Sequence, residues 1–209
     1  MNFVLIGAPL SGKGTIGDLL SKKYQIPHIS MGDLLRNCAT GDNKYSRYLS
    51  EHIASGKLIN DDLVKVILED RLSKKDCKNG YVLDGYPRNV EQAEKLDTFT
   101  NIDKAIYVTV SKITMIDRLR SRIVCSNCYT SYNMNTYKNK VCEKCSAPLI
   151  KREDDKEDIL IERVKIYNAN SYPIISKYSR DKKLVTISNE GDINLVFNEL
   201  IGKIENDNT

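Results

Sequence analysis

The chain lacks the features that would mark it for a membrane or for export. Its 209 residues include no tryptophan and only three phenylalanines. No apolar run approaches the roughly 20 residues that a membrane helix needs, and the stretch before Gly7 is too short for a signal peptide. We therefore expect a cytoplasmic protein that does not enter a membrane and whose cysteines stay reduced.

The chain also lacks a dominant charge, a repeated unit and a low-complexity segment beyond its polar tail. Lys+Arg 32 against Asp+Glu 28 leave a net charge of +4, which by itself is too small to indicate nucleic acid binding. With 41% hydrophobic and 29% charged residues, the composition is typical of a folded globular chain. The length suffices for one domain that carries insertions.

What the sequence does contain is a regular alternation of short apolar runs and helical patterns. The apolar runs carry β-branched residues and end in Gly, Asp or Ser, as buried parallel strands do. Between them, apolar residues recur at helical spacing. This alternation predicts an α/β fold with a doubly wound, five-stranded parallel sheet flanked by helices. The expected strands are residues 3–6, 28–29, 81–83, 105–110 and 184–187; the expected helix faces are Ile193, Val196, Phe197, Leu200 and Ile204, and Ile113, Ile116 and Leu119.

Two segments interrupt the alternation. Residues 31–73 have helical patterns but no clear strand. Residues 123–152 have neither strong periodicity nor a long apolar run, yet they hold four of the six cysteines. Both segments are predicted to be insertions into the α/β core.

A glycine-rich segment follows the first expected strand and precedes a helix. Its residues, Gly7-Ala8-Pro9-Leu10-Ser11-Gly12-Lys13-Gly14-Thr15, fit the phosphate-binding pattern G-x-x-x-x-G-K. Glycines let backbone N–H groups surround phosphate oxygens, the lysine supplies a positive charge, and the helix N-terminus adds to it. Thr15 is the candidate hydroxyl beside Mg²⁺, although the general pattern places Ser or Thr one position earlier.

The cysteines of the second insertion form two pairs. Cys125-x-x-Cys128 and Cys142-x-x-Cys145 are separated by thirteen residues, a spacing that predicts a tetrahedral zinc site made of four thiolates. Four protein ligands leave no open position, so the zinc is expected to be structural and to help a segment poor in apolar residues to fold. Two disulfides conflict with a reducing compartment, and an iron–sulfur cluster remains an alternative. We assign no function to the remaining cysteines, Cys38 and Cys77.

Further motifs are spread along nearly the whole chain. They are Ser30-Met31-Gly32-Asp33 with Arg36; Gly56-Lys57-Leu58-Ile59; Asp84-Gly85-Tyr86-Pro87-Arg88 with Gln92; Arg118 with Arg122; Arg152 with Asp154 and Asp155; and Arg163. Together with the phosphate loop and the cysteine pairs, they resemble the adenylate kinase family in its zinc-lid form. The resemblance implies reversible, Mg²⁺-dependent transfer of the terminal phosphoryl group from ATP to AMP, giving two ADP and serving adenine nucleotide homeostasis.

The resemblance also implies how the chain is divided. A P-loop core would comprise residues 1–29, 60–122 and 160–209. Residues 30–59 would form a helical AMP-binding insertion, and residues 123–159 a zinc-binding lid. The expected partners are the small molecules ATP, AMP and ADP, with no nucleic acid and no membrane, and the expected state is a monomer.

Individual residues take roles from the same resemblance. The catalytic residues would be Lys13, Arg88, Arg122, Arg152 and Arg163. ATP would be bound by residues 7–15 with Arg118, Arg122, Ser131, Tyr132 and Gly191. AMP would be bound by Met31, Arg36, Lys57, Leu58, Ile59, Gly85, Tyr86, Pro87, Arg88, Gln92, Arg152 and Arg163. Thr15 and Asp84 would orient water around Mg²⁺, Asp154 and Asp155 would position arginines, and the two histidines would be structural or exposed.

Several positions depart from the family's usual pattern, among them Ser121, Ile123 and Asn133. Leu10, Tyr129 and Asn189 stand where glycine is common, and Met31 stands where threonine is usual. Because Met31 is expected near the base of AMP, a kinase for a different nucleoside monophosphate is one alternative. A nucleic acid-binding zinc ribbon is another, supported by three lysines and three tyrosines around the cysteine pairs. The lysines are Lys138, Lys140 and Lys144.

Overall fold

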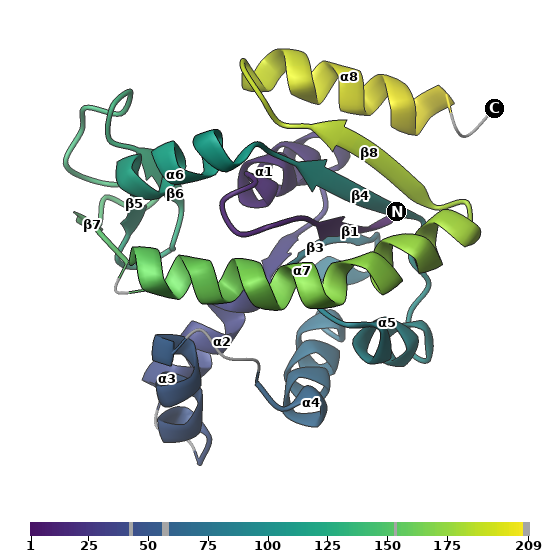
Figure 1. The fold of residues 1–209 in the computed structure, drawn as a ribbon. Coiled ribbons are helices and arrows are strands. Elements are labelled where there is room, and N and C mark those ends of the chain that lie inside the picture. Colours follow the sequence, from purple (N-terminus) through teal and green to yellow (C-terminus); the bar gives the residue numbers. More distant parts are fainter. Residues whose placement is uncertain (42–43, 56–58, 153, 207–209) are drawn as a thin grey trace.

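The core of the molecule is a five-stranded parallel sheet. The computed structural model describes residues 1–41, 44–55, 59–152 and 154–206. Its core strands lie in the order β2–β3–β1–β4–β8, so β1 is central and its neighbours come from far along the chain (Figure 1). The expected sheet is thereby confirmed. The strands are β1 Asn2–Ile6, β2 His28–Ser30, β3 Tyr81–Asp84, β4 Lys104–Thr109 and β8 Leu184–Ser188.

Both faces of this sheet are buried. In β1, Phe3 and Leu5 belong to the hydrophobic cluster on one face, while Val4 and Ile6 belong to the cluster on the other. A strand covered on both sides has no solvent-facing positions, so it appears in the sequence as a continuous apolar run. This is why residues 3–6 show no alternation of polar and apolar side chains.

Helices cover the two faces of the sheet. Side chains of α1 and α8 complete one hydrophobic cluster, and side chains of α5 and α7 contribute to the other. Figure 1 shows α7 running along the sheet from the core to a smaller lobe. Polar side chains cap the shorter helices: Asn89 accepts a hydrogen bond from the N–H of Gln92 (2.7 Å), which starts α5. The bounds are α1 Lys13–Tyr24, α5 Val90–Asp97, α6 Lys112–Ser121, α7 Glu157–Arg180 and α8 Ile193–Asn206.

The first insertion is helical, as expected. It comprises α2 (Met31–Thr40) and α3 (Ser46–Ser55), followed by α4 (Asp61–Leu72) and a short 3-10 turn, η1 (Lys75–Cys77). Within the described part of residues 31–73 there is no strand. In α2 the hydroxyl of Ser30 accepts a hydrogen bond from the N–H of Asp33 (3.3 Å), so the helix begins at the very end of β2.

The second insertion contains a small sheet that the sequence did not predict. Its strands are β5 (Arg122–Cys125), β6 (Ser131–Asn133) and β7 (Leu149–Ile150), and they pair antiparallel in the order β6–β5–β7. We call residues 122–150 the β5–β7 lobe. Strands of two to four residues are too short to show a periodic pattern, which is why only the cysteines marked this segment.

One predicted helix face is wrong in part. The helix around residues 113–119 exists as α6, but Ile113 is 75% exposed. Its buried face consists of Met115 and Leu119, which pack with Leu10 of the glycine-rich loop and Leu160 of α7. The core covers α6 only from its second turn on.

Among the helices in the described ranges, none combines the length and the apolar character needed to cross a membrane.

Candidate active site

The loop between β1 and α1 surrounds the ammonium group of Lys13. Lys13 is the first residue of α1, and its Nζ donates hydrogen bonds to the carbonyl oxygens of Gly7 (2.9 Å) and Ala8 (2.8 Å). Gly12 has φ +86°, the left-handed conformation that glycine adopts without penalty. A phosphate bound in this loop would lie at the positive N-terminal end of α1 and close to the ammonium group of Lys13, which the loop surrounds.

The outer side of the loop is held by two residues from other elements. Arg118 of α6 donates hydrogen bonds to the carbonyl oxygens of Leu10 (3.1 Å) and Asn189 (2.9 Å), and buried Asn189 donates to that of Ser11 (2.7 Å). Leu10 itself has φ +62° and is nearly buried, so its packing against Met115 helps to offset a backbone conformation that favours glycine. The side chains at residues 10 and 189 thus both connect the loop to neighbouring elements.

Asp84 lies at the end of β3, beside the start of α1. A Cβ on Gly14 would lie 3.8 Å from Oδ2 of Asp84, which places this carboxylate against the loop. Burial raises the pKa of Asp84, but His28, Lys13 and Arg88 lower it below the usual value. The carboxylate is therefore ionised at neutral pH, as a group that orients water on Mg²⁺ must be.

His28 is a neighbour of this site that the sequence did not reveal. Its Nδ1 lies 2.9 Å from Asp18, and its Nε2 lies 3.8 Å from Asp84. Burial opposes the charged ring, but the two carboxylates raise the pKa of His28 to about 9. Gly17 leaves room for the ring, since a Cβ there would lie 2.5 Å from Nε2. His28 is expected from the sequence to be structural or exposed; in the structure its ring is largely enclosed and places a positive charge behind Asp84.

Positive side chains converge on one cavity beside the loop. Gly7, Lys13, Arg88 and Arg163 line it together. Burial and the nearby arginines lower the pKa of Lys13 to about 8, and burial and Arg163 lower that of Arg88 to about 10. The nearby carboxylates therefore do not neutralise all of the positive charge around this cavity. The charge of a polyphosphate would relieve this repulsion, and arginine forks match phosphate oxygens.

The remaining predicted arginines are brought to the same region by acidic partners. Arg122 Nε lies 2.9 Å from Asp155, and Arg163 lies 3.0 Å from Asp154. These are the contacts that Asp154 and Asp155 need in order to position the two arginines. Arg36 and Arg152 share a third carboxylate, since both contact Asp33, Arg152 at 3.5 Å.

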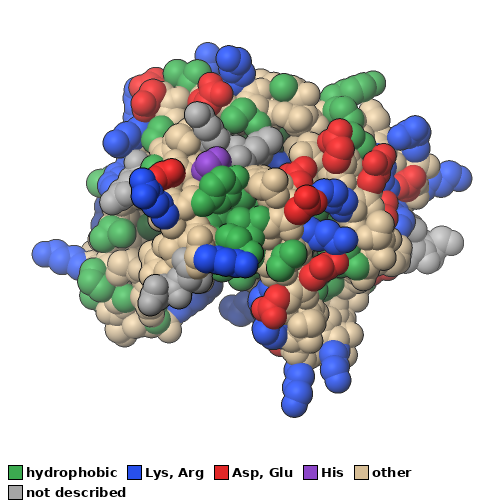
Figure 2. Space-filling model, turned by 90° about the horizontal axis from the view of Figure 1, so that it is seen from below, with side chains coloured by type: hydrophobic (Ala, Val, Ile, Leu, Met, Phe, Trp, Pro, Cys, Tyr) green, Lys and Arg blue, Asp and Glu red, His purple; other side chains and the backbone are tan. Residues whose placement is uncertain are grey.

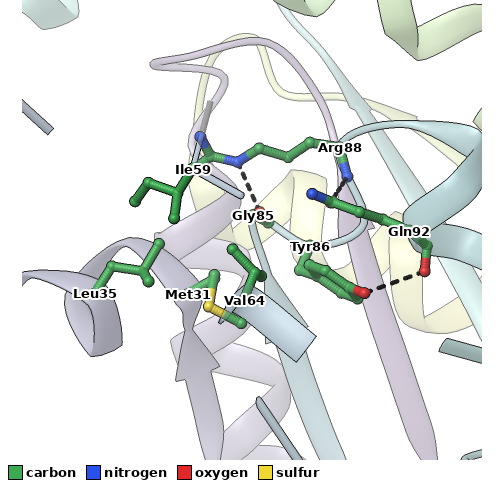
Figure 3. A pocket seen from close by; sticks show the side chains of 8 residues that line it. All are labelled: Met31, Leu35, Ile59, Val64, Gly85, Tyr86, Arg88 and Gln92. Atoms are coloured by element: carbon green, nitrogen blue, oxygen red, sulfur yellow. Dashed lines mark hydrogen bonds between the residues drawn. The ribbon is translucent and has the colours of Figure 1, made fainter. Parts of the chain in front are cut away.

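A second pocket adjoins this cavity. Met31 and Leu35 of α2, Ile59, and Val64 of α4 form an apolar wall on one side, and Gln92 lies on the other (Figure 3). The side-chain oxygen of Gln92 accepts a hydrogen bond from the N–H of Arg88 (2.7 Å), which ties this polar group to the phosphate side. Gly85 and Arg88 line both pockets.

Other predicted residues take less central places. Thr15 is exposed in the first turn of α1, Ser131 is exposed in β6, and Gly191 has φ +83° in the turn before α8. Tyr132 lies on the cysteines instead, with its hydroxyl 3.1 Å from Sγ of Cys142. Lys57 and Leu58 fall outside the described residues.

The four predicted cysteine ligands come together in the β5–β7 lobe. Their sulfur atoms all lie within 4.8 Å of one another, and none forms a disulfide. Sulfurs about 2.3 Å from a tetrahedral zinc would be roughly 3.8 Å apart, so the cluster fits this metal. The N–H groups of Asn127 and Cys128 point at Sγ of Cys125, and that of Lys144 at Sγ of Cys142, each at 3.4 Å. Such donors favour thiolates. Burial raises the pKa of Cys142, but the hydroxyl of Tyr132 and the N–H of Lys144 bring it below the usual value. At Cys125 burial outweighs the N–H donors and raises the pKa to about 11.

The three lysines behind the nucleic acid-binding hypothesis differ in their surroundings. Lys138 and Lys140 are exposed. Lys144 is also exposed, but it pairs with Asp18 of α1 at 3.3 Å. On the face seen from below, acidic and basic side chains are interspersed among the described residues (Figure 2). Nucleic acid binding favours clustered positive charge instead.

Two adjoining pockets, one with a phosphate loop and one apolar, suit an enzyme that passes a phosphoryl group between two nucleotides. This is the class of the nucleoside monophosphate kinases. A family model described as adenylate kinase matches residues 5–183. The chain is 39% identical to an adenylate kinase of Thermosipho africanus over 98% of its own length and 99% of the relative's. It is 38% identical to one of Kosmotoga olearia (99% and 100%) and 36% identical to one of Thermoanaerobacter sp. (96% and 96%).

The chain therefore belongs to the adenylate kinase family and is a nucleoside monophosphate kinase. The resemblance drawn from separated motifs is confirmed. The four-cysteine cluster supports the zinc-lid form of the family.

Proposed function

We propose that the protein transfers the terminal phosphoryl group of ATP reversibly to AMP, yielding two ADP. The observation that carries this proposal is that Arg88 and Gly85 border both pockets. A monophosphate whose base lies against Met31 and Val64 would present its phosphate to Arg88. The terminal phosphate of a triphosphate held at Lys13 would face it.

The residues of the cavity would act by position and charge. In the transfer, the bond between the terminal phosphorus and its bridging oxygen breaks, and an oxygen of the AMP phosphate bonds to that phosphorus. This chemistry needs little covalent help from the protein. The positive side chains would hold the two phosphates in line and stabilise the charge that spreads over the transferred group. We assign this catalytic role to Lys13, Arg88, Arg122, Arg152 and Arg163.

The remaining contacts follow from the same arrangement. ATP would also contact the backbone of residues 7–15, and Arg118 would support it by holding that loop from outside. Arg36 would bind the AMP phosphate, and Gln92 would bind the adenine edge from its place in the apolar pocket.

Two metals complete the proposal. Asp84 and Thr15 would hold water ligands of the Mg²⁺ that accompanies ATP, a cation that retains most of its water in proteins. When bound, Mg²⁺ neutralises part of the phosphate charge. The cysteine cluster would hold zinc as a structural ion and stabilise the short strands around it.

The two insertions would act as covers over the reacting groups. Residues 30–59 would close over AMP, and residues 123–159 would form the lid over ATP. Closure excludes water, which would otherwise accept the phosphoryl group. Residues 1–29, 60–122 and 160–209 would form the core. We propose that the protein works in this way as a cytoplasmic monomer that balances adenine nucleotides.

A coupled assay with a panel of acceptors tests the proposal. ATP is offered with AMP, UMP, CMP or GMP, with and without Mg²⁺, and the zinc content of the same preparation is measured. We expect fastest turnover with AMP and none without Mg²⁺. Turnover with another monophosphate but not with AMP would reject the proposed acceptor.

A further inference from the structure

The two C-x-x-C turns of the β5–β7 lobe have the same backbone geometry. The residue after each pair, Tyr129 in one and Ser146 in the other, has a left-handed φ, +57° and +59°. Each donates its N–H to the carbonyl oxygen of the first cysteine of its pair, at 3.2 Å and 2.8 Å. This conformation favours glycine and penalises a side chain that branches into a large ring. A tyrosine at residue 129 is therefore not required by the turn.

The ring of Tyr129 has a contact outside its own lobe. The guanidinium of Arg36 in α2 lies 5.6 Å from the ring centroid, within the range of a cation–π interaction. Tyr129 belongs to the second insertion and Arg36 to the first. The contact thus joins the two covers directly.

Arg36 lies among other charged side chains that compete for the same partners. Asp33, the carboxylate that pairs with it directly, is shared with Arg152, and Asp154, whose pKa the charge of Arg36 lowers, pairs with Arg163. Burial lowers the pKa of Arg152, and the charge of Arg36 is the next largest cause. The charge of Arg36 also lowers the pKa of Arg163. These effects show how close the three cations are. Nε of Arg36 is buried and has no hydrogen-bond partner among the described residues. Hydrogen bonds alone therefore do not fix the orientation of the Arg36 side chain.

We propose that Tyr129 is a positioning residue, which holds Arg36 in the orientation that receives the acceptor phosphate when the lobe is closed. The inference rests on the proposed role of Arg36 in binding AMP. Since coupling between sites is reciprocal, an acceptor bound at Arg36 would also favour the closed lobe. One cation–π contact of ordinary strength corresponds to a change of about two- to fivefold in affinity.

The twin turn supplies a matched control. Tyr129→Gly and Ser146→Gly relieve the same backbone conformation, but only the first removes a ring from Arg36. Tyr129→Phe keeps the ring. For each variant we would measure AMP affinity by calorimetry without ATP, the KM for AMP, kcat, zinc content and melting temperature.

We expect Tyr129→Gly to weaken AMP binding and raise the KM for AMP about two- to fivefold, with zinc retained and a melting temperature no lower than that of the parent. Tyr129→Phe restores the affinity, and Ser146→Gly leaves it unchanged. Unchanged AMP affinity in Tyr129→Gly, or an equal loss in Ser146→Gly, would overturn the inference. The variant Arg36→Lys tests separately whether Arg36 binds AMP. If Arg36 has no such role, Arg36→Lys would bind AMP as the parent does.

Discussion

The buried ammonium group of Lys13 predicts that ATP binding takes up a proton at alkaline pH. Burial is the largest cause that lowers its pKa, and Arg88, Arg163 and Arg122 lower it further against the opposing effect of Asp84, to about 8. The phosphates of ATP would favour the charged form and raise this pKa on binding. At a pH between the pKa of Lys13 in the free enzyme and its higher pKa in the ATP complex, the free enzyme must gain a proton before Lys13 can pair with phosphate.

The magnitude follows from the fraction of enzyme that is protonated. With a pKa of about 8, Lys13 is about 90% charged at pH 7 and about 10% charged at pH 9. The apparent Kd for ATP should therefore rise about tenfold over this range, or about 1.4 kcal/mol. Proton uptake on binding should grow from about 0.1 at pH 7 to about 0.9 at pH 9.

Isothermal calorimetry of ATP binding, in buffers of different ionisation enthalpy and without AMP, measures this uptake directly. Lys13→Met should abolish it. Because the pKa of His28 is about 9, His28→Gln is the second control, and this variant should retain the uptake. An uptake that is absent from the parent at pH 9, or that persists in Lys13→Met, would refute the assignment.

Three further predictions concern other parts of the molecule. Arg88→Ala should lower kcat/KM by about 10²–10³-fold, as loss of a phosphate-stabilising group does, with an unchanged circular dichroism spectrum; near-normal turnover would contradict its role. Cys142→Ala, or removal of zinc by a chelator, should increase hydrogen exchange in β5, β6 and β7 while the five-stranded sheet stays protected; equal protection in both states would argue against a structural metal. Because the folded pKa of His28, about 9, exceeds the unfolded value of 6.5, its stabilisation is complete below pH 6.5 and is lost as the pH rises through 9. The difference in unfolding free energy between the parent and His28→Gln should therefore shrink over that range, from at most about 3 kcal/mol; a difference independent of pH would exclude a charged ring.

The sequence by itself determined the features that depend on neighbours along the chain. Residues 3–6 predicted the central strand because burial on both faces leaves a continuous apolar run. Residues 7–15 predicted the phosphate loop, and the two cysteine pairs predicted the metal site, since each is a local turn with a fixed spacing. The helical nature of residues 31–73 followed from periodicity in the same way.

Tertiary structure decided which distant side chains meet. The sequence marked each arginine by its motif, but only the fold places Arg88 and Arg163 in one cavity with Lys13. No local pattern revealed that Asn189 and Arg118 hold the phosphate loop, since the hydrogen bond from Asn189 to Ser11 joins residues 178 positions apart. The same holds for His28 behind Asp84 and for Tyr129 over Arg36. Periodicity reports only which face of an element is apolar, whereas contacts between side chains depend on how the elements pack.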